Sequence, residues 1–185
     1  MNNKKLPCYA VLLIITLAAG LILGATYTLT KQPIDAQQAL SQENARKAVL
    51  PAAEAFEALE TPEGLDWLYS GSCGGEFVGY AAQITTSGFG GEIEIVIGVD
   101  ADGTLGGISV GGSNFSETAG LGAKSKDASF TDQFAGKTYP LNVVKAGEEK
   151  TDSSIDAITS ATITSKAVTN AVNTAVEIIM GGSAE

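Results

Sequence analysis

The segment "DAITSATITSKAV", residues 156–168, carries a dense cluster of side chains that can do chemistry. Its hydroxyl residues are Thr159, Ser160, Thr162, Thr164 and Ser165. Apolar residues at helical spacing follow, so the cluster is expected at the start of a helix. The free N–H groups and partial positive charge of a helix N-terminus favour a phosphate, and a threonine there can be esterified to one. Ordinary helix capping, with Ser165 as N-cap and Gly181 as the stop, is the favoured interpretation from these residues alone.

A second segment, "ETAGLGAK" at residues 117–124, is rich in small residues. Gly120 and Gly122 allow either close approach of a flat ligand to the backbone or tight turns. On these residues alone, tight turns are the favoured interpretation.

The composition excludes several kinds of site. The chain has no histidine, which excludes a Ser-His-Asp triad, histidine ligation of haem and most catalytic zinc sites. Its two cysteines, Cys8 and Cys73, are too few to hold an iron–sulfur cluster alone. Redox chemistry would therefore need an organic cofactor. The net charge of −10 repels phosphate backbones, so we expect no nucleic-acid partner.

The N-terminal region predicts a membrane anchor. Residues 8–26 form 19 consecutive positions without a charge, about 28 Å of helix, which matches the hydrocarbon core of a bilayer. Lys4 and Lys5 precede this run, so the positive-inside rule places the N-terminus in the cytoplasm and the rest of the chain outside. A cleaved signal peptide is the alternative, but its apolar region is usually shorter, so the uncleaved anchor is favoured.

The pattern of the remaining chain predicts an α+β fold with a mainly antiparallel sheet packed by helices. Helices are expected over residues 36–59, with a break at Pro51, over a short stretch at 128–136, and over 165–180. Strands are expected over 77–86, 92–98, 104–110 and 141–147, the middle two as a hairpin around "DADG". The expected organisation is residues 1–7 as cytoplasmic N-terminus, 8–30 as transmembrane helix, 31–62 as helical connector and 63–185 as an extracytoplasmic domain.

The segment "DAITSAT" resembles the flavinylation motif of the FMN-binding domain family, Asp-x-x-(Ser/Thr)-Gly-Ala-Thr. Asp156, Thr159, Ala161 and Thr162 match this motif, while Ser160 stands where glycine is usual. The resemblance implies that a dedicated flavin transferase joins FMN, through its phosphate, to Thr162. Within this motif, Thr159 and Ser160 are candidates to donate hydrogen bonds to the phosphate, and Asp156 is a candidate to order the motif or to be recognised by the transferase.

The segment "ETAGLGAK" resembles the Glu-Thr-Pro-Gly-Leu-Gly segment of the same family. Its matching residues are Glu117, Thr118, Gly120, Leu121 and Gly122, with Ala119 in place of the proline. The resemblance implies that this segment lies against the flavin ring. Lys124, which follows directly, is a candidate either for an electrostatic contact with the cofactor or, equally, for an ion pair with surface acids. No residue is expected to be catalytic by itself or to bind a metal.

The order of these segments over residues 77–180, together with the single anchor, is similar to flavin subunits of Rnf-type ion-translocating oxidoreductase complexes. This implies an electron carrier in the cytoplasmic membrane whose partners are the other membrane subunits. Two alternatives stay open. The same domain can serve another electron chain, such as the sodium-pumping NADH:quinone oxidoreductase or extracellular electron transfer. It can also be a cofactor-free surface domain with a Ser/Thr-rich helix cap.

Overall fold

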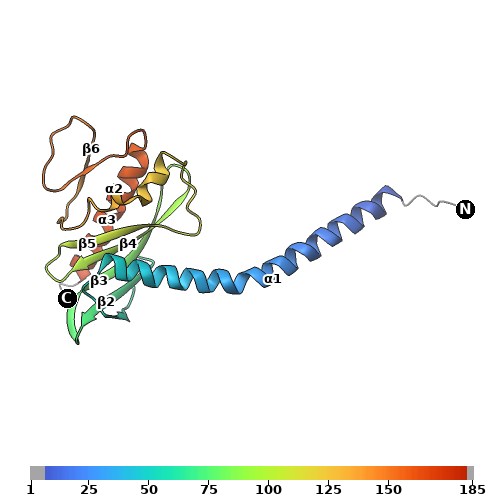
Figure 1. Cartoon of the computed structure of the whole chain (residues 1–185), viewed down its shortest axis with the longest axis horizontal. Helices are drawn as coiled ribbons and strands as arrows, with labels where there is room; N and C mark the ends of the chain where they lie inside the picture. Colours follow the sequence, from blue (N-terminus) through green and yellow to red (C-terminus); the bar gives the residue numbers. More distant parts are fainter. Residues whose placement is uncertain (1–6, 183–185) are drawn as a thin grey trace, which may run out of the picture. The chain divides into compact units, whose positions relative to one another are not determined.

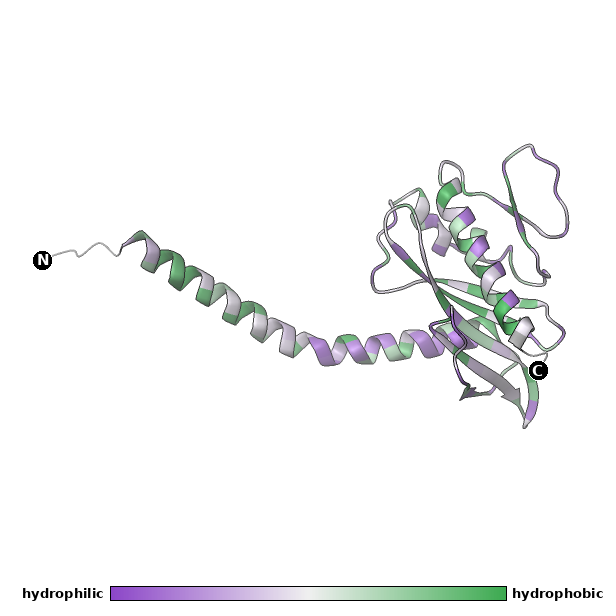
Figure 2. Ribbon diagram, turned by 180° about the vertical axis from the view of Figure 1, so that it is seen from behind, coloured by the Kyte–Doolittle hydropathy of each residue, from purple (hydrophilic) through white to green (hydrophobic). Residues whose placement is uncertain are grey.

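The computed structural model describes residues 7–182, and the chain falls into two units that divide after Ser41. Helix α1, Cys8–Val49, spans this division (Figure 1). Its first part is apolar and its second part is polar (Figure 2). By length and composition α1 could cross a membrane, and it is the one such helix in the described part of the chain.

The helix expected over 36–59 is shorter in the structure, because α1 ends at Val49. Pro51 lacks a backbone N–H and disfavours the helical conformation at Leu50. The following segment forms strand β1, Ala55–Ala58, which pairs antiparallel with β2, Trp67–Cys73. The prediction was therefore wrong for residues 50–59. Pairing with β2 outweighs the helix propensity of alanine and glutamate there.

The main sheet is antiparallel and follows chain order, β1-β2-β3-β4-β5. Strand β3 is Glu76–Ser87, β4 is Glu92–Asp100 and β5 is Leu105–Gly111. The predicted hairpin is confirmed, since β4 pairs with β5 from Glu94 opposite Gly111 to Val99 opposite Leu105. Together with the helices described next, this sheet confirms the predicted α+β class.

Successive side chains of β4 point to opposite faces of the sheet, and both faces are buried. Ile93, Ile95 and Ile97 are fully buried in the main core together with helix α3, Thr162–Gly182. The helical stripe predicted from the sequence is confirmed, because each of its members is buried: Val168, Val172, Ala175, Val176 and Ile179. Val96, between the isoleucines, belongs instead to a second cluster with Val49 from the end of α1. One face of the sheet thus holds α3 and the other holds the last turn of α1.

Four glycines form a seat for the end of α1 and for Leu50, which follows it, one on each of the strands from β2 to β5: Gly71, Gly79, Gly98 and Gly106. A Cβ atom on Gly98 would lie 1.9 Å from the carbonyl oxygen of Val49, and one on Gly106 would lie 2.6 Å from it. At Gly71 a Cβ would lie 2.5 Å from a methyl group of Leu50. The glycine seat therefore lets the helix end approach the sheet backbone closely.

Arg46, in the last turn of α1, reinforces this contact. Its guanidinium carbon lies 4.5 Å from the ring centroid of Tyr69 and 5.5 Å from that of Trp67. Both rings belong to β2, so a cation–π contact supplements the apolar packing of Val49. The last turn of α1 is thus an integral part of the folded domain.

The second half of the domain brings two loops to one end of α3. Strand β5 leads through residues 112–121 into the 3₁₀ helix η1, Gly122–Lys126, and then into α2, Ala128–Thr131. Strands β6, Asn142–Val144, and β7, Ser154–Asp156, pair in parallel, and β7 runs into the start of α3. The short helix predicted at 128–136 and the strand predicted at 141–147 are thus confirmed in shortened form. The contacts of η1 with α3 bring together the two segments singled out in the sequence.

Candidate functional site

The approach to α3 is a tight turn over residues 158–161. The amide of Ala161 donates to the carbonyl of Ile158 at 2.9 Å, which closes the turn. Ser160, at its third position, has φ of 64° and is the one non-glycine residue with positive φ in the described chain. A turn with positive φ at this position favours glycine, because a Cβ atom crowds the backbone there. This geometry explains why glycine is usual at the position of Ser160 in the flavinylation motif that residues 156–162 resemble.

We expect Ser160→Gly to stabilise the protein. Glycine removes the strain at φ of 64°, and this outweighs its higher entropy in the unfolded chain, so the free energy of unfolding should rise by about 1 kcal/mol. Thermal or urea unfolding followed by circular dichroism measures the change. Thr159→Gly is the matched control, because Thr159 is also exposed and does not have positive φ, and it should destabilise. A destabilised Ser160→Gly variant would contradict this account of the turn.

Ser165 does not cap α3, so this part of the capping interpretation was wrong. The helix begins at Thr162, and Ser165 lies within its first turn. Its hydroxyl donates to the carbonyl of Ala161 at 3.0 Å and accepts the amide of Ile158 at 2.9 Å. Ser165 therefore ties the turn to the helix. At the other end, α3 continues to Gly182, one residue beyond the predicted stop at Gly181.

The start of α3 is left without a capping side chain. Ala161, which precedes the helix, has no side-chain acceptor, and within residues 7–182 the amides of Thr162, Ile163 and Thr164 have no hydrogen-bond acceptor. The start of α3 therefore combines three free amide donors with the positive end of the helix dipole. Such an arrangement suits a phosphate group.

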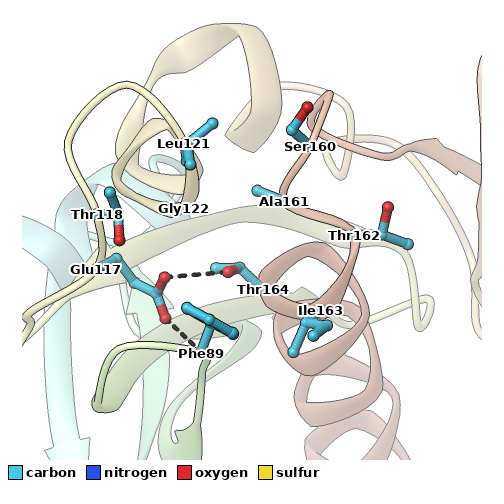
Figure 3. A pocket seen from close by; sticks show the side chains of 10 residues that line it. All are labelled: Phe89, Glu117, Thr118, Leu121, Gly122, Ser160, Ala161, Thr162, Ile163 and Thr164. Carbon is cyan, nitrogen blue, oxygen red and sulfur yellow. Dashed lines mark hydrogen bonds between the residues drawn. The ribbon is translucent and has the colours of Figure 1, made fainter.

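Glu117 joins the η1 loop, which is residues 112–126 with η1 at its end, to the β3–β4 turn, residues 88–91, and to helix α3. Glu117 is 9% exposed, and its carboxylate accepts hydrogen bonds from the amides of Phe89 and Gly90, at 2.7 and 3.0 Å. The hydroxyl of Thr164 donates to its second oxygen at 3.1 Å. Glu117 therefore links the β3–β4 turn, the η1 loop and the first turn of α3, as Figure 3 shows.

These segments enclose a pocket of about 320 Å³. Its lining residues are Phe89, Glu117, Thr118, Leu121, Gly122, Ser160, Ala161, Thr162, Ile163 and Thr164. The Thr162 side chain is directed away from the Glu117 carboxylate (Figure 3). Phe89, Ile163 and Leu121 are 70%, 60% and 40% exposed. Large apolar side chains left open to solvent around a pocket indicate a ligand with an apolar surface.

The pocket brings together seven of the eleven residues selected from the sequence: Glu117, Thr118, Leu121, Gly122, Ser160, Ala161 and Thr162. The other four are not among its lining residues. Gly120 turns the loop with φ of 77°, and Thr159 and Lys124 flank the lining residues. Asp156 binds Lys150 through a 2.6 Å ion pair, and its amide donates to the Gln133 side chain.

Three lining residues were missed by sequence reasoning: Phe89, Ile163 and Thr164. Phe89 lies in "GFGG", a glycine-rich turn between two strands, where an exposed aromatic is a signal of binding. Thr164 was part of the hydroxyl cluster but was not assigned to the site. No local signal in the sequence indicates its bond to Glu117, 47 positions away.

The pocket residues fit FMN, which combines a flat, largely apolar ring system with a phosphate. The free amides at the start of α3 suit the phosphate, and the exposed apolar side chains suit the ring. Gly122 keeps the loop close to α3, since a Cβ atom there would lie 2.8 Å from the Thr164 hydroxyl.

Comparison with known proteins agrees with this fit, because the FMN-binding domain family matches residues 88–177. This range contains the β3–β4 turn, the η1 loop and the start of α3. The fold and site thus define the class of the protein as an FMN-binding domain with an N-terminal apolar helix.

Relatives specify the class further. The G subunit of the Na⁺-translocating ferredoxin:NAD⁺ oxidoreductase complex of Acetobacterium woodii is 38% identical, over 91% of this chain and 88% of that protein. The G subunit of the proton-translocating complex of Clostridium ljungdahlii is 34% identical, over 86% and 83%. The chain belongs to the family of G subunits of these ion-translocating oxidoreductase (Rnf) complexes. It is accordingly a membrane-anchored flavoprotein subunit of electron transport.

A solved structure shares the fold. The crystal structure of the C subunit of the Na⁺-translocating NADH-quinone reductase from Parabacteroides distasonis has a TM-score of 0.55 and 26% identity. The similarity covers 64% of this chain and 62% of that one. The two proteins therefore share a fold over about two thirds of their lengths.

Proposed function

We propose that this chain is the electron-carrier subunit of an Rnf-type ion-translocating complex, with FMN attached through a phosphoester to Thr162. Bound FMN supplies the electron transfer, and the protein holds it, tunes it and prevents its loss. The observation that carries the proposal is the position of Thr162 at the uncapped start of α3, beside a pocket with apolar walls.

The phosphate end of the site rests on α3. Thr162 is half-buried, so its hydroxyl remains reachable by a flavin transferase. The amides of Thr162, Ile163 and Thr164 are available to the attached phosphate, and the exposed Ser160 and Thr159 can donate further hydrogen bonds. Asp156 lies in β7, which pairs with β6 and leads into the motif, and it forms an exposed ion pair with Lys150 outside the lining of the pocket.

The ring end of the site rests on the η1 loop and the β3–β4 turn. Phe89, Leu121 and Ile163 supply apolar contact area, and Thr118 and Gly122 line the space between them. These segments are rigidly joined by Glu117. Gly120 shapes the loop, and Lys124 in η1 offers a positive charge next to the lining residues.

The proposed location explains a covalent link. With Lys4 and Lys5 in the cytoplasm, the domain lies on the outer side of the membrane. No intracellular pool of FMN replaces a lost cofactor there, so a phosphoester to Thr162 secures it. The other membrane subunits of the complex are the proposed electron partners.

The similarity to the C subunit of the Na⁺-translocating NADH-quinone reductase supports a second candidate, the same role in that complex. The higher identity and wider coverage of the relatives from ferredoxin:NAD⁺ oxidoreductase complexes favour the Rnf-type complex. Affinity purification from gently solubilised membranes, followed by mass spectrometry of the accompanying subunits, separates the two.

Expression with and without a flavin transferase tests the proposed attachment. The full chain made with the transferase should remain yellow after denaturation, and the chain made without it should be colourless. Flavin that is released on denaturation in both cases would restrict the proposal to non-covalent FMN. A chain that binds no flavin in either case would overturn it.

A further inference from the structure

Glu117 is a buried acid in the wall of the pocket whose charge has no cationic partner. Its carboxylate only accepts hydrogen bonds, from two backbone amides and the Thr164 hydroxyl, as an ionised carboxylate does. In the described part of the chain, no lysine or arginine forms an ion pair with it. Its negative charge is therefore stabilised by neutral hydrogen-bond donors and by no ion pair with a cationic side chain of the described residues.

Two glycines make room for this carboxylate. A Cβ atom on Gly88 would lie 2.2 Å from one carboxylate oxygen of Glu117, and one on Gly122 would lie 2.0 Å from the other. The β3–β4 turn and the η1 loop thus close around the charged group from both sides. A neighbouring hydroxyl adds to this, because Ser116 donates to the carbonyl of Gly90 at 2.8 Å and fixes the same turn. The carboxylate is therefore held in one place.

We propose that Glu117 is a fixed negative charge that lowers the reduction potential of the flavin in this pocket. The inference rests on the proposed function in one respect only, that FMN occupies the pocket. Reduction adds electron density to the ring system, and a nearby negative charge opposes that addition. The effect is stronger for a buried group than for an exposed one, because water screens it less. Glu117 also positions the three segments that form the pocket, so the two roles have to be separated experimentally.

The Glu117→Gln variant of the full, flavin-loaded chain removes the charge and keeps the shape. Glutamine can accept both amides through its oxygen, and its amide group takes the place of the second carboxylate oxygen beside Thr164. We expect the midpoint potential, measured by spectroelectrochemical titration of the flavin absorbance, to shift to a more positive value. Glu92→Gln is the matched control, because Glu92 is an exposed acid at the start of β4 and its loss should leave the potential unchanged.

Thr164→Val is a second test, in which the expected shift of the midpoint potential has the opposite sign. The buried Thr164 hydroxyl donates to the Glu117 carboxylate and partly offsets its charge. Removing the hydroxyl while keeping the side-chain shape should shift the midpoint potential to a more negative value. A role for Glu117 that is merely structural predicts that both variants loosen the pocket and shift the potential in the same direction, or not at all.

The outcomes separate this inference from the proposed function. An unchanged potential in Glu117→Gln, or shifts of the same sign in the two variants, would overturn the charge role while FMN binding stands. If Glu117→Gln carries no flavin, Thr164→Val decides: a more negative potential supports the inference, and an unchanged or more positive one overturns it. A wild-type chain without flavin, measured by its absorbance after expression with the transferase, overturns the proposed function and with it this inference.

Discussion

The Thr162→Ala variant is expected to fold normally and to carry no covalent flavin. Thr162 offers the hydroxyl at the start of α3, and alanine is a good helix former at the same position. In cells that contain the flavin transferase, we expect complete loss of flavin fluorescence from the denatured protein band. The circular dichroism spectrum and melting temperature should stay close to those of the wild-type chain expressed without the transferase.

Thr162→Ser is the matched control for this variant, because it keeps a hydroxyl at the same place. It should retain covalent flavin, at a level set by the transferase. The neighbouring hydroxyls provide a second control, since Thr159→Ala and Ser160→Ala leave Thr162 intact and should remain flavinylated. Covalent flavin on Thr162→Ala would contradict the assignment, because the flavin would then be attached to another residue.

The Gly98→Ala variant is expected to destabilise the domain strongly. The added Cβ atom would lie 1.9 Å from the carbonyl oxygen and 2.5 Å from the carbonyl carbon of Val49. Both are backbone atoms, so no side-chain rotation relieves the clash and the end of α1 has to leave the glycine seat. We expect the free energy of unfolding to fall by about 2–4 kcal/mol, measured by urea unfolding in detergent.

Gly111→Ala is the matched control, because Gly111 also lies in the sheet and a Cβ atom there meets nothing within 4 Å. It should change the stability by less than about 0.5 kcal/mol. Trp67 reports on the same contact, since it is the one tryptophan of the chain and lies under Arg46 of α1. Its fluorescence should change in Gly98→Ala and stay the same in Gly111→Ala. Equal stability of the two variants would contradict the close contact between α1 and the sheet.

Local patterns in the sequence predicted strands β3 to β5 and helix α3, but not strands β1, β2 and β7. The alternation of "EIEIVIG" identified β4, and the apolar spacing after Ser165 identified the buried stripe of α3. Both signals come from residues close together in the chain, where burial on one face dictates the period. Strand β1 was missed because its composition favours a helix, and only its partner β2 makes it a strand.

The candidate site was predictable in part. The motifs around Thr162 and Leu121 were identified through their resemblance to a family, and the structure brings both to one pocket. The partners of Glu117 could not be read from the sequence, because Phe89 and Thr164 lie 28 and 47 positions away. The positive φ of Ser160 was equally hidden, although the usual glycine of the motif indicated the position.

Intact-mass spectrometry followed by peptide mapping tests the central claim most directly. The full chain is expressed with the flavin transferase, denatured, and measured before and after proteolysis. The proposal predicts a mass increase of one phosphate-linked FMN per chain, confined to the peptide that contains Thr162. An unmodified mass, or a flavin on a peptide that lacks Thr162, would contradict it.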